Sequence, residues 1–124
     1  MRTYLFVSAA EPLLSAIAVS AAPTPPDLCV TSPSHRARAT AAFACAGRVV
    51  RTIDEPLLAR PCDSESSADV AARFARALRA LHAFDSRYIL VVLDEVGLGG
   101  CSGFELDDEA LLRHGPEVPA RSPG

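Results

Sequence analysis

The sequence contains no lysine, asparagine, glutamine or tryptophan, and only 6% of its 124 residues are aromatic. All twelve basic residues are therefore arginine, which we attribute to GC-rich coding rather than to a functional need for arginine. The formal net charge is −3, and the sequence lacks the clustered positive charge that binding to a phosphate backbone requires. We therefore expect no nucleic acid among the partners of this protein.

The sequence also lacks the cysteine and histidine spacing of a metal site. There is no CxxC pair, and the histidines are not placed relative to the cysteines as zinc ligands would be. The residues concerned are Cys29, Cys45, Cys62, Cys101, His35, His82 and His114. We expect no metal and no cofactor, and we expect the thiols to be buried or inert in a reducing cytoplasm.

A long apolar segment is missing as well. The N-terminus begins like a secretion signal, with Arg2 before an apolar stretch and small residues at 19–22, but Glu11 and Pro12 interrupt it. No apolar run reaches the roughly 20 residues that a membrane-spanning helix needs. The sequence therefore predicts a cytoplasmic protein with no membrane among its partners.

The segments that are present alternate between strand-like and helix-like patterns. Short apolar runs, typical of buried parallel strands, are found at Thr3–Val7, Leu28–Thr31, Arg48–Ile53 and Arg87–Leu93. Helices are predicted between them at Pro12–Ala22, from the Ser32–Pro33 pair to Gly47, and at Ser67–Phe84. This order predicts an α/β fold, a three-layer sandwich with a mostly parallel sheet.

Chain length and helix-capping residues set the expected boundaries. A chain of this size suits one hydrophobic core, so we expect a single domain at 1–115 and a disordered tail at 116–124. Ser32 is expected to cap the second helix, while Ser66 and Asp69 predict a capping box at the start of the third. After the last strand we expect a glycine-rich turn, a short apolar run and a weak element, at 97–103, 104–106 and 107–113.

In a sheet of this kind, the ligand site lies beyond the carboxyl ends of the strands. The second predicted strand is followed there by the pattern SPxxRAxxTA, formed by Ser32, Pro33, Arg36, Ala37, Thr40 and Ala41. This pattern is similar to the second-strand signature of the histidine phosphatases, the phosphoglycerate mutase-like superfamily. The segment from Glu65 to Arg73 also resembles the ES..DV..R motif that opens a later helix of that family. The resemblance covers most of residues 3 to 93 in order and implies a shortened histidine-phosphatase-like fold.

The catalytic residues of that family are absent from the matching positions. After the first strand, Ser8 stands in place of an arginine and Ala9 in place of the nucleophilic histidine. After the last strand, Asp94 stands in place of the second histidine, and neither Ala59 nor Arg60 supplies the acid expected near them. The resemblance therefore implies a degenerate member, because the family mechanism needs a histidine nucleophile and a cationic phosphate cradle.

The charge expected at the site supports the same interpretation. Of the cationic residues only Arg36 remains, and the Asp94 carboxylate would repel a phosphate oxygen at ~4 Å by roughly 4 kcal/mol per pair of unit charges. A guanidinium that no longer receives phosphate needs another anion. We therefore predict an ion pair between Arg36 and either Asp94 or Glu11.

Two classes of function remain open. In the first, the chain is a pseudoenzyme that acts as a non-catalytic binding or regulatory partner. In the second, it is a repurposed enzyme that uses the acid/base chemistry of Glu11, Asp94 and Arg36 on a small molecule, with Ser8 and Glu95 as further ligand contacts beside Arg36. A deep pocket around the first three residues would favour the enzyme, and a flat apolar face would favour the binding module.

The helix predicted at Pro12–Ala22 bears on the choice between these classes. It is apolar or small on every side, whereas a surface helix of a monomer carries a polar face. The lid insertions of the family are also largely missing, which should leave apolar surface uncovered. We therefore expect a homodimer or a complex with a larger protein partner, burying on the order of 1,200 Å² or more.

Overall fold

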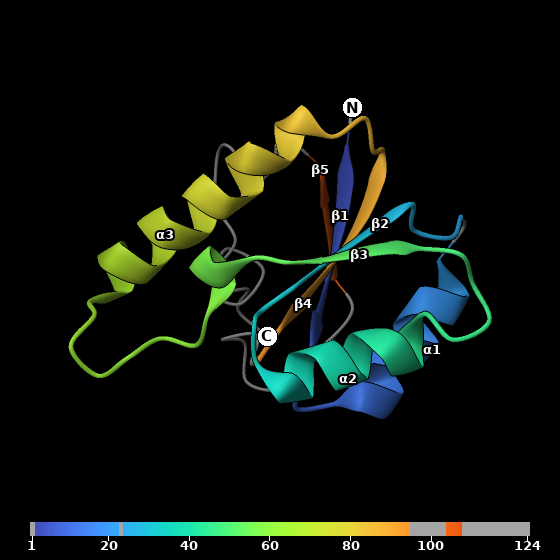
Figure 1. The fold of residues 1–124 in the computed structure, drawn as a ribbon, viewed down its shortest axis with the longest axis horizontal. Coiled ribbons are helices and arrows are strands. Elements are labelled where there is room, and N and C mark those ends of the chain that lie inside the picture. Colours follow the sequence, from blue (N-terminus) through green and yellow to red (C-terminus); the bar gives the residue numbers. More distant parts are fainter. Residues whose placement is uncertain (1, 23, 95–103, 108–124) are drawn as a thin grey trace.

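We describe residues 2–22, 24–94 and 104–107 of the protein from a computed structural model. They form a five-stranded sheet in the order β3-β2-β4-β1-β5 (Figure 1). Its strands are β1 (Thr3–Ser8), β2 (Leu28–Thr31), β3 (Arg51–Asp54), β4 (Tyr88–Leu93) and β5 (Phe104–Asp107). The first four run parallel, and β5 pairs antiparallel with β1. The predicted α/β fold with a mostly parallel sheet is confirmed.

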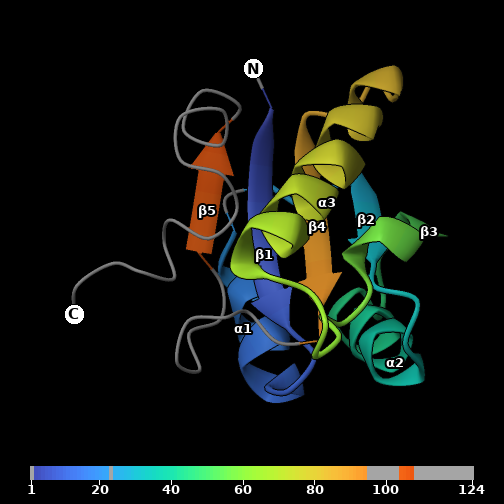
Figure 2. The ribbon, with the colours of Figure 1, turned by 90° about the vertical axis from the view of Figure 1, so that its left-hand side faces the viewer.

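Helices cover both faces of the sheet (Figure 2). One face carries α1 (Pro12–Ala21) and α2 (His35–Ala44). The other carries α3 (Ser67–Ala80) and two short 3₁₀ helices, η1 (Pro56–Leu58) and η2 (Leu81–Ala83). The three layers match the predicted sandwich.

The hydrophobic core consists of two layers, one on each face of the sheet. Successive side chains of a strand point to opposite faces, so β1 directs Tyr4 and Phe6 toward α3, and Leu5 and Val7 toward α1 and α2. All six residues of β4 are buried in the same alternating way. Burial on both faces explains why these strands are continuously apolar.

Residues at the helix starts explain most of the helix boundaries. Pro12 begins α1, where its missing N–H costs no hydrogen bond. Ser66 and Asp69 form the predicted capping box of α3. Gly47, with φ of 78°, supplies the left-handed backbone shortly after α2, as expected for a stop.

The predicted cap of α2 was wrong by two residues. Ser34, not Ser32, caps this helix, because its hydroxyl accepts a hydrogen bond from the Ala37 N–H at 3.1 Å. The backbone of Ser32 is still hydrogen-bonded to the sheet, because its N–H donates to the Val92 carbonyl of β4 at 2.9 Å. This shift frees the Ser32 hydroxyl for a different partner.

Two further boundaries differ from the sequence expectation. β3 begins at Arg51 rather than Arg48. Among the described strands it is an edge strand that pairs with β2, and the fully exposed Val49 precedes it. α3 ends at Ala80 and continues only as the 3₁₀ helix η2, short of Phe84. The predicted turn at 97–103, the rest of the weak element beyond 107, and the predicted tail at 116–124 lie outside the described residues.

Candidate functional site

The carboxyl ends of three parallel strands meet at one edge of the sheet. The Ala9 N–H donates to the Leu93 carbonyl at 2.7 Å, and the Ser32 N–H donates to the Val92 carbonyl at 2.9 Å. The residues that follow β1, β2 and β4, which are Ala9, Ser32 and Asp94, therefore lie at the same edge. This is where ligands bind in open α/β sheets.

The Asp94 side chain joins two of the segments that meet at this edge. It is only 5% exposed, and Ser32 beside it is fully buried. The carboxylate accepts a hydrogen bond from the Ser32 hydroxyl at 2.6 Å through Oδ2, and one from the Ser34 hydroxyl through Oδ1. A buried carboxylate must be hydrogen-bonded to persist, and these two hydroxyls meet that need. Ser34 also caps α2, so it ties the carboxylate to the start of that helix.

Arg36 does not form the predicted ion pair. Its side chain is exposed, and its Nη2 donates to the main-chain carbonyl of Asp94 at 3.3 Å rather than to the carboxylate. Within the described residues, neither Asp94 nor Glu11 forms an ion pair with it. The prediction fails because the Asp94 oxygens already hold two serine hydroxyls, while Arg36 sits on the exposed first turn of α2, where water can solvate it.

A cleft opens above this edge. Its volume is about 370 Å³, and it is lined by Ser32, Pro33, Ser34, Arg36, Ala59, Arg60 and Asp94. A second cavity of about 180 Å³ shares Arg60 and Asp94 with the first and is otherwise lined by Leu58, Pro61, Phe74 and Leu93. Asp94 and two arginines from different segments thus line one cleft, next to a cavity with mostly apolar walls. Ser34 was missed by the sequence reasoning, because its partner Asp94 lies sixty residues away in the chain.

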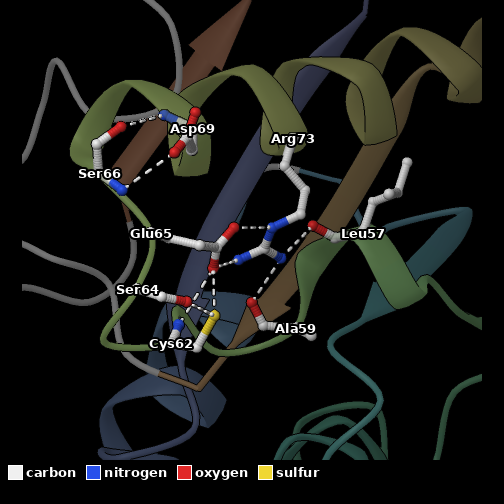
Figure 3. A network of polar contacts seen from close by, with 8 residues as sticks. All are labelled: Leu57, Ala59, Cys62, Ser64, Glu65, Ser66, Asp69 and Arg73. Carbon is white, nitrogen blue, oxygen red and sulfur yellow. Dashed lines mark hydrogen bonds and ion pairs between the residues drawn. The ribbon is translucent and has the colours of Figure 1, made fainter.

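The wall that carries Ala59 and Arg60 is fastened to α3 by one side chain (Figure 3). The Arg73 guanidinium donates from Nη1 to the main-chain carbonyls of Leu57 at 2.7 Å and Ala59 at 2.8 Å. The same guanidinium pairs with the Glu65 carboxylate at 2.9 Å and 3.0 Å. Arg73 is therefore not a solvated side chain of the helix surface, and the helical pattern of the sequence gives no sign that a loop folds over it.

Glu65 is held from two sides in this network. Hydrogen bonding from Arg73, followed by the Cys62 backbone N–H, lowers the pKa of Glu65 from 4.5 to about 2. The carboxylate is therefore charged at neutral pH and joins the 62–65 turn to α3. This contact fixes the loop that forms one side of the cleft, while the capping box of Ser66 and Asp69 fixes the helix start next to it (Figure 3).

The remaining predicted site residues lie elsewhere. Ser8 is buried at the end of β1, where its hydroxyl accepts from the Ala10 N–H at 3.1 Å and its carbonyl accepts from the Ser15 hydroxyl at 2.9 Å. Glu11 is half-buried just before α1 and does not line the cleft. Glu95 lies outside the described residues. The structure thus brings Asp94 and Arg36 together, and it leaves Ser8 and Glu11 out of the cleft lining.

The thiols of Cys29 and Cys45 lie in the core layer beneath α2. Cys29 is fully buried, and its pKa is raised by its hydrogen bond to Cys45 and by burial. The same hydrogen bond lowers the pKa of Cys45, which is half-buried. Both are free cysteines, and Cys29 is packed as a small core residue, as predicted. In the part of the chain that the structure describes, no three His, Cys, Asp or Glu side chains are grouped to hold a metal ion.

Comparisons with known proteins bear on the fold alone. No protein-family model matches the sequence, and no curated protein matches it either. The structure is similar to the crystal structure of a candidate alpha-ribazole-5'-P phosphatase from Escherichia coli strain K-12 substrain MG1655, with a TM-score of 0.61 and 14% sequence identity. The match covers 79% of this chain and 77% of that chain. The chain therefore has a histidine-phosphatase-like fold. None of the helices in the described ranges is long and apolar enough to cross a membrane.

Proposed function

We propose that this chain is a pseudoenzyme, a histidine-phosphatase-like protein that does not transfer phosphate and acts by binding another protein chain. The observation that carries the proposal is the position of Asp94. Its buried carboxylate directly follows β4, at the position where the resemblance places a catalytic histidine, and two serine hydroxyls hold it there. A fixed negative charge at that point opposes the binding of phosphate.

The end of β1 supports the same proposal. Ala9, at the position matched to the nucleophilic histidine, is 2% exposed and has no group that could accept phosphate. Covalent phosphoryl transfer requires such a nucleophile. We therefore expect no hydrolysis of an aryl phosphate such as para-nitrophenyl phosphate by the purified protein. Turnover that survives repurification and is abolished by Arg36→Ala would contradict the proposal.

The alternative of a repurposed enzyme has less support. It requires Glu11, Asp94 and Arg36 to act on one small molecule, but Glu11 does not line the cleft that the other two share. The Asp94 carboxylate is also committed to two serine hydroxyls. The arrangement favours binding over acid/base catalysis.

The exposed face of α1 supports a protein partner. Leu13, Leu14 and Ile17 are 64%, 49% and 55% exposed, and no residue from Pro12 to Ala21 carries a charge. An open groove of about 400 Å³ lies on the same helix, lined by Ala16, Ile17, Ser20 and Ala21. Apolar side chains gathered in this way are typical of an interface. We propose that this face binds a second copy of the chain or a larger protein, in the cytoplasm, where free thiols such as Cys29 remain reduced.

A charge placed on that face tests the interface. Ile17→Glu should leave the fold intact, because the side chain is exposed, and should abolish association in sedimentation velocity. Ala72→Glu is the matched control, because Ala72 is exposed on α3 and lies on the opposite face of the sheet. A wild-type chain that sediments as a monomer at tens of micromolar, and that recovers no partner from its native host, would contradict the proposed interface.

A further inference from the structure

Two thiols from different segments meet beneath α2. Cys29 is the second residue of β2, and Cys45 directly follows the last residue of α2. After β2 the chain turns back, and α2 runs along the sheet in the opposite direction, so the end of the helix lies over the start of the strand (Figure 1). Both residues pack in the same core layer, and their side chains are hydrogen-bonded to each other. The fold therefore places two sulfur atoms in contact.

The two thiols differ in their exposure to solvent. Cys29 is completely buried, whereas Cys45 is half-buried, and both are free cysteines. A small molecule in solution therefore has access to Cys45 and none to Cys29. Cys29 can react only with a group that the fold already places beside it, and its hydrogen bond places Cys45 there.

The hydrogen bond also makes the two thiols chemically unequal. It lowers the pKa of Cys45, as does the positive charge of Arg48, and these effects outweigh that of burial. The same hydrogen bond raises the pKa of Cys29, and burial raises it further. Cys45 thus ionises first, while Cys29 keeps its proton and donates it to the Cys45 sulfur. Because the thiolate is the nucleophilic form of cysteine, Cys45 is the group that attacks.

A pair of this kind narrows the class of reactant. An alkylating agent would modify Cys45 and leave Cys29 unused. A metal ion such as zinc would need further ligands, and among the described residues no three His, Cys, Asp or Glu side chains are grouped to hold one. A two-electron oxidant uses both thiols, because an oxidised cysteine condenses with a neighbouring thiol. An accessible, readily ionised thiol beside a second cysteine is typical of sites that react with peroxide.

We propose that Cys45 and Cys29 form an oxidation site that reacts with a small hydroperoxide, such as hydrogen peroxide, and closes to a disulfide. The Cys45 thiolate attacks one peroxide oxygen, the O–O bond breaks, and the leaving hydroxide takes up the proton that Cys45 has lost, giving water. The Cys29 sulfur then attacks the sulfur of the sulfenic acid, the S–O bond breaks, and the hydroxide leaves with the Cys29 proton as a second water. The two thiols lose two electrons, and the peroxide gains them.

The disulfide joins the start of β2 to the end of α2. The segment between the two cysteines contains Ser32, Ser34 and Arg36, so closing this loop restrains the chain that forms one wall of the cleft. The site is independent of the function proposed above, because neither cysteine lines the cleft or the groove on α1. In a reducing cytoplasm the pair rests as two thiols, and the disulfide forms when peroxide is present.

Peptide mapping of the wild-type protein tests the proposal. The folded protein is treated with hydrogen peroxide, and the remaining thiols are blocked with N-ethylmaleimide in denaturant. Trypsin then separates the two cysteines by cutting after Arg36 and Arg38. We expect peptides 3–36 and 39–48 to be joined, with the loss of two hydrogen atoms, and to separate after reduction.

Three results of this mapping would overturn the proposal. The first is a free Cys29 beside a Cys45 that has been oxidised to the sulfinic acid. The second is a Cys45 that is joined to Cys62 or Cys101 instead. The third is a pair of thiols that stays unmodified in excess peroxide.

Two variants assign the roles of the two thiols. In Cys29→Ala, Cys45 should stop at the sulfenic acid and carry a dimedone adduct that the wild type does not retain. Cys62→Ser is the matched control, because Cys62 is exposed and its sulfur contacts Ser64 and Glu65, and it should form the disulfide as the wild type does. Equal dimedone labelling of Cys45 in the wild type and in Cys29→Ala would overturn the role of Cys29. If Cys29→Ala does not fold, the peptide map of the wild-type protein decides.

Discussion

The two walls of the cleft are built by different means. On the α2 side, a buried carboxylate is held by neutral hydroxyls from Ser32 and Ser34. On the α3 side, the partly exposed ion pair of Glu65 and Arg73 holds the loop carbonyls. Burial makes each hydrogen bond on the first wall costly to remove, whereas water and salt replace much of an exposed ion pair. We therefore expect the contacts of Asp94 to contribute more to the stability of this edge than the ion pair of Glu65 and Arg73 does.

The strongest test of this comparison is the removal of Ser34, because its hydroxyl serves both α2 and Asp94. Ser34→Ala should lower the free energy of unfolding by about 3 kcal/mol, from a lost helix cap and a lost hydrogen bond to a buried charge. The measurement is urea unfolding followed by circular dichroism. Ser66→Ala is the matched control, because Ser66 caps α3 in an exposed setting, and it should cost only about 1 kcal/mol. Equal losses in the two variants would show that the contact with Asp94 adds nothing.

Removing Ser32 isolates the buried contact from the cap. Ser32→Ala should cost about 2 kcal/mol, since it leaves one oxygen of a buried carboxylate without its donor. In the Asp94→Asn background the same substitution should cost clearly less, because an amide oxygen needs the donor less than a charged one does. An identical cost in both backgrounds would indicate that Ser32 acts through packing rather than through Asp94.

These serines also show where the sequence reasoning succeeds and where it fails. The strands, the layers and the capping box at Ser66 were predictable, because each depends on residues close together in the chain. The Ser32 hydroxyl was assigned to the local helix start, yet its partner is Asp94, sixty-two residues away. The sequence does not show that the Ser32 N–H donates to the Val92 carbonyl of the sheet. Because the backbone at Ser32 is still bonded to the sheet, the helix begins later and Ser34 is its cap.

Arg73 and Arg36 illustrate the same limit for charged side chains. The periodicity of α3 places Arg73 on a polar face, but it cannot show that the loop after η1 folds back over that face. Arg36 was expected to form an ion pair with Asp94 or Glu11. Because its side chain is exposed, water can solvate the guanidinium and no carboxylate partner is required. The positions of both residues in the chain were informative, whereas their partners depended on tertiary contacts.

The α3 wall should be less sensitive than the Asp94 wall. Arg73→Met keeps most of the apolar stem and removes the donors to Leu57 and Ala59, and it should cost about 1.5 kcal/mol. Arg76→Met is a suitable control, because Arg76 is exposed on the same helix, and it should change stability by less than about 0.5 kcal/mol. A loss for Arg73→Met larger than that for Ser34→Ala would reverse the ranking of the two walls.

The smallest expected effect on stability comes from removing the charge of Glu65. This effect depends on pH. The pKa of Glu65 is lowered by Arg73 from 4.5 to about 2, so the folded protein favours the ionised form. The pairing then stabilises the fold fully above the unfolded pKa of 4.5, and this contribution is lost as the pH falls through the folded value of about 2. The stability difference between wild type and Glu65→Gln should therefore be present at pH 7, shrink between these two values, and be smaller in high salt, because the pair is partly exposed. Urea unfolding of both proteins across this pH range measures it. A difference that persists unchanged at the acid end would mean that Glu65 supports the loop by its shape and hydrogen bonds, and not by its charge.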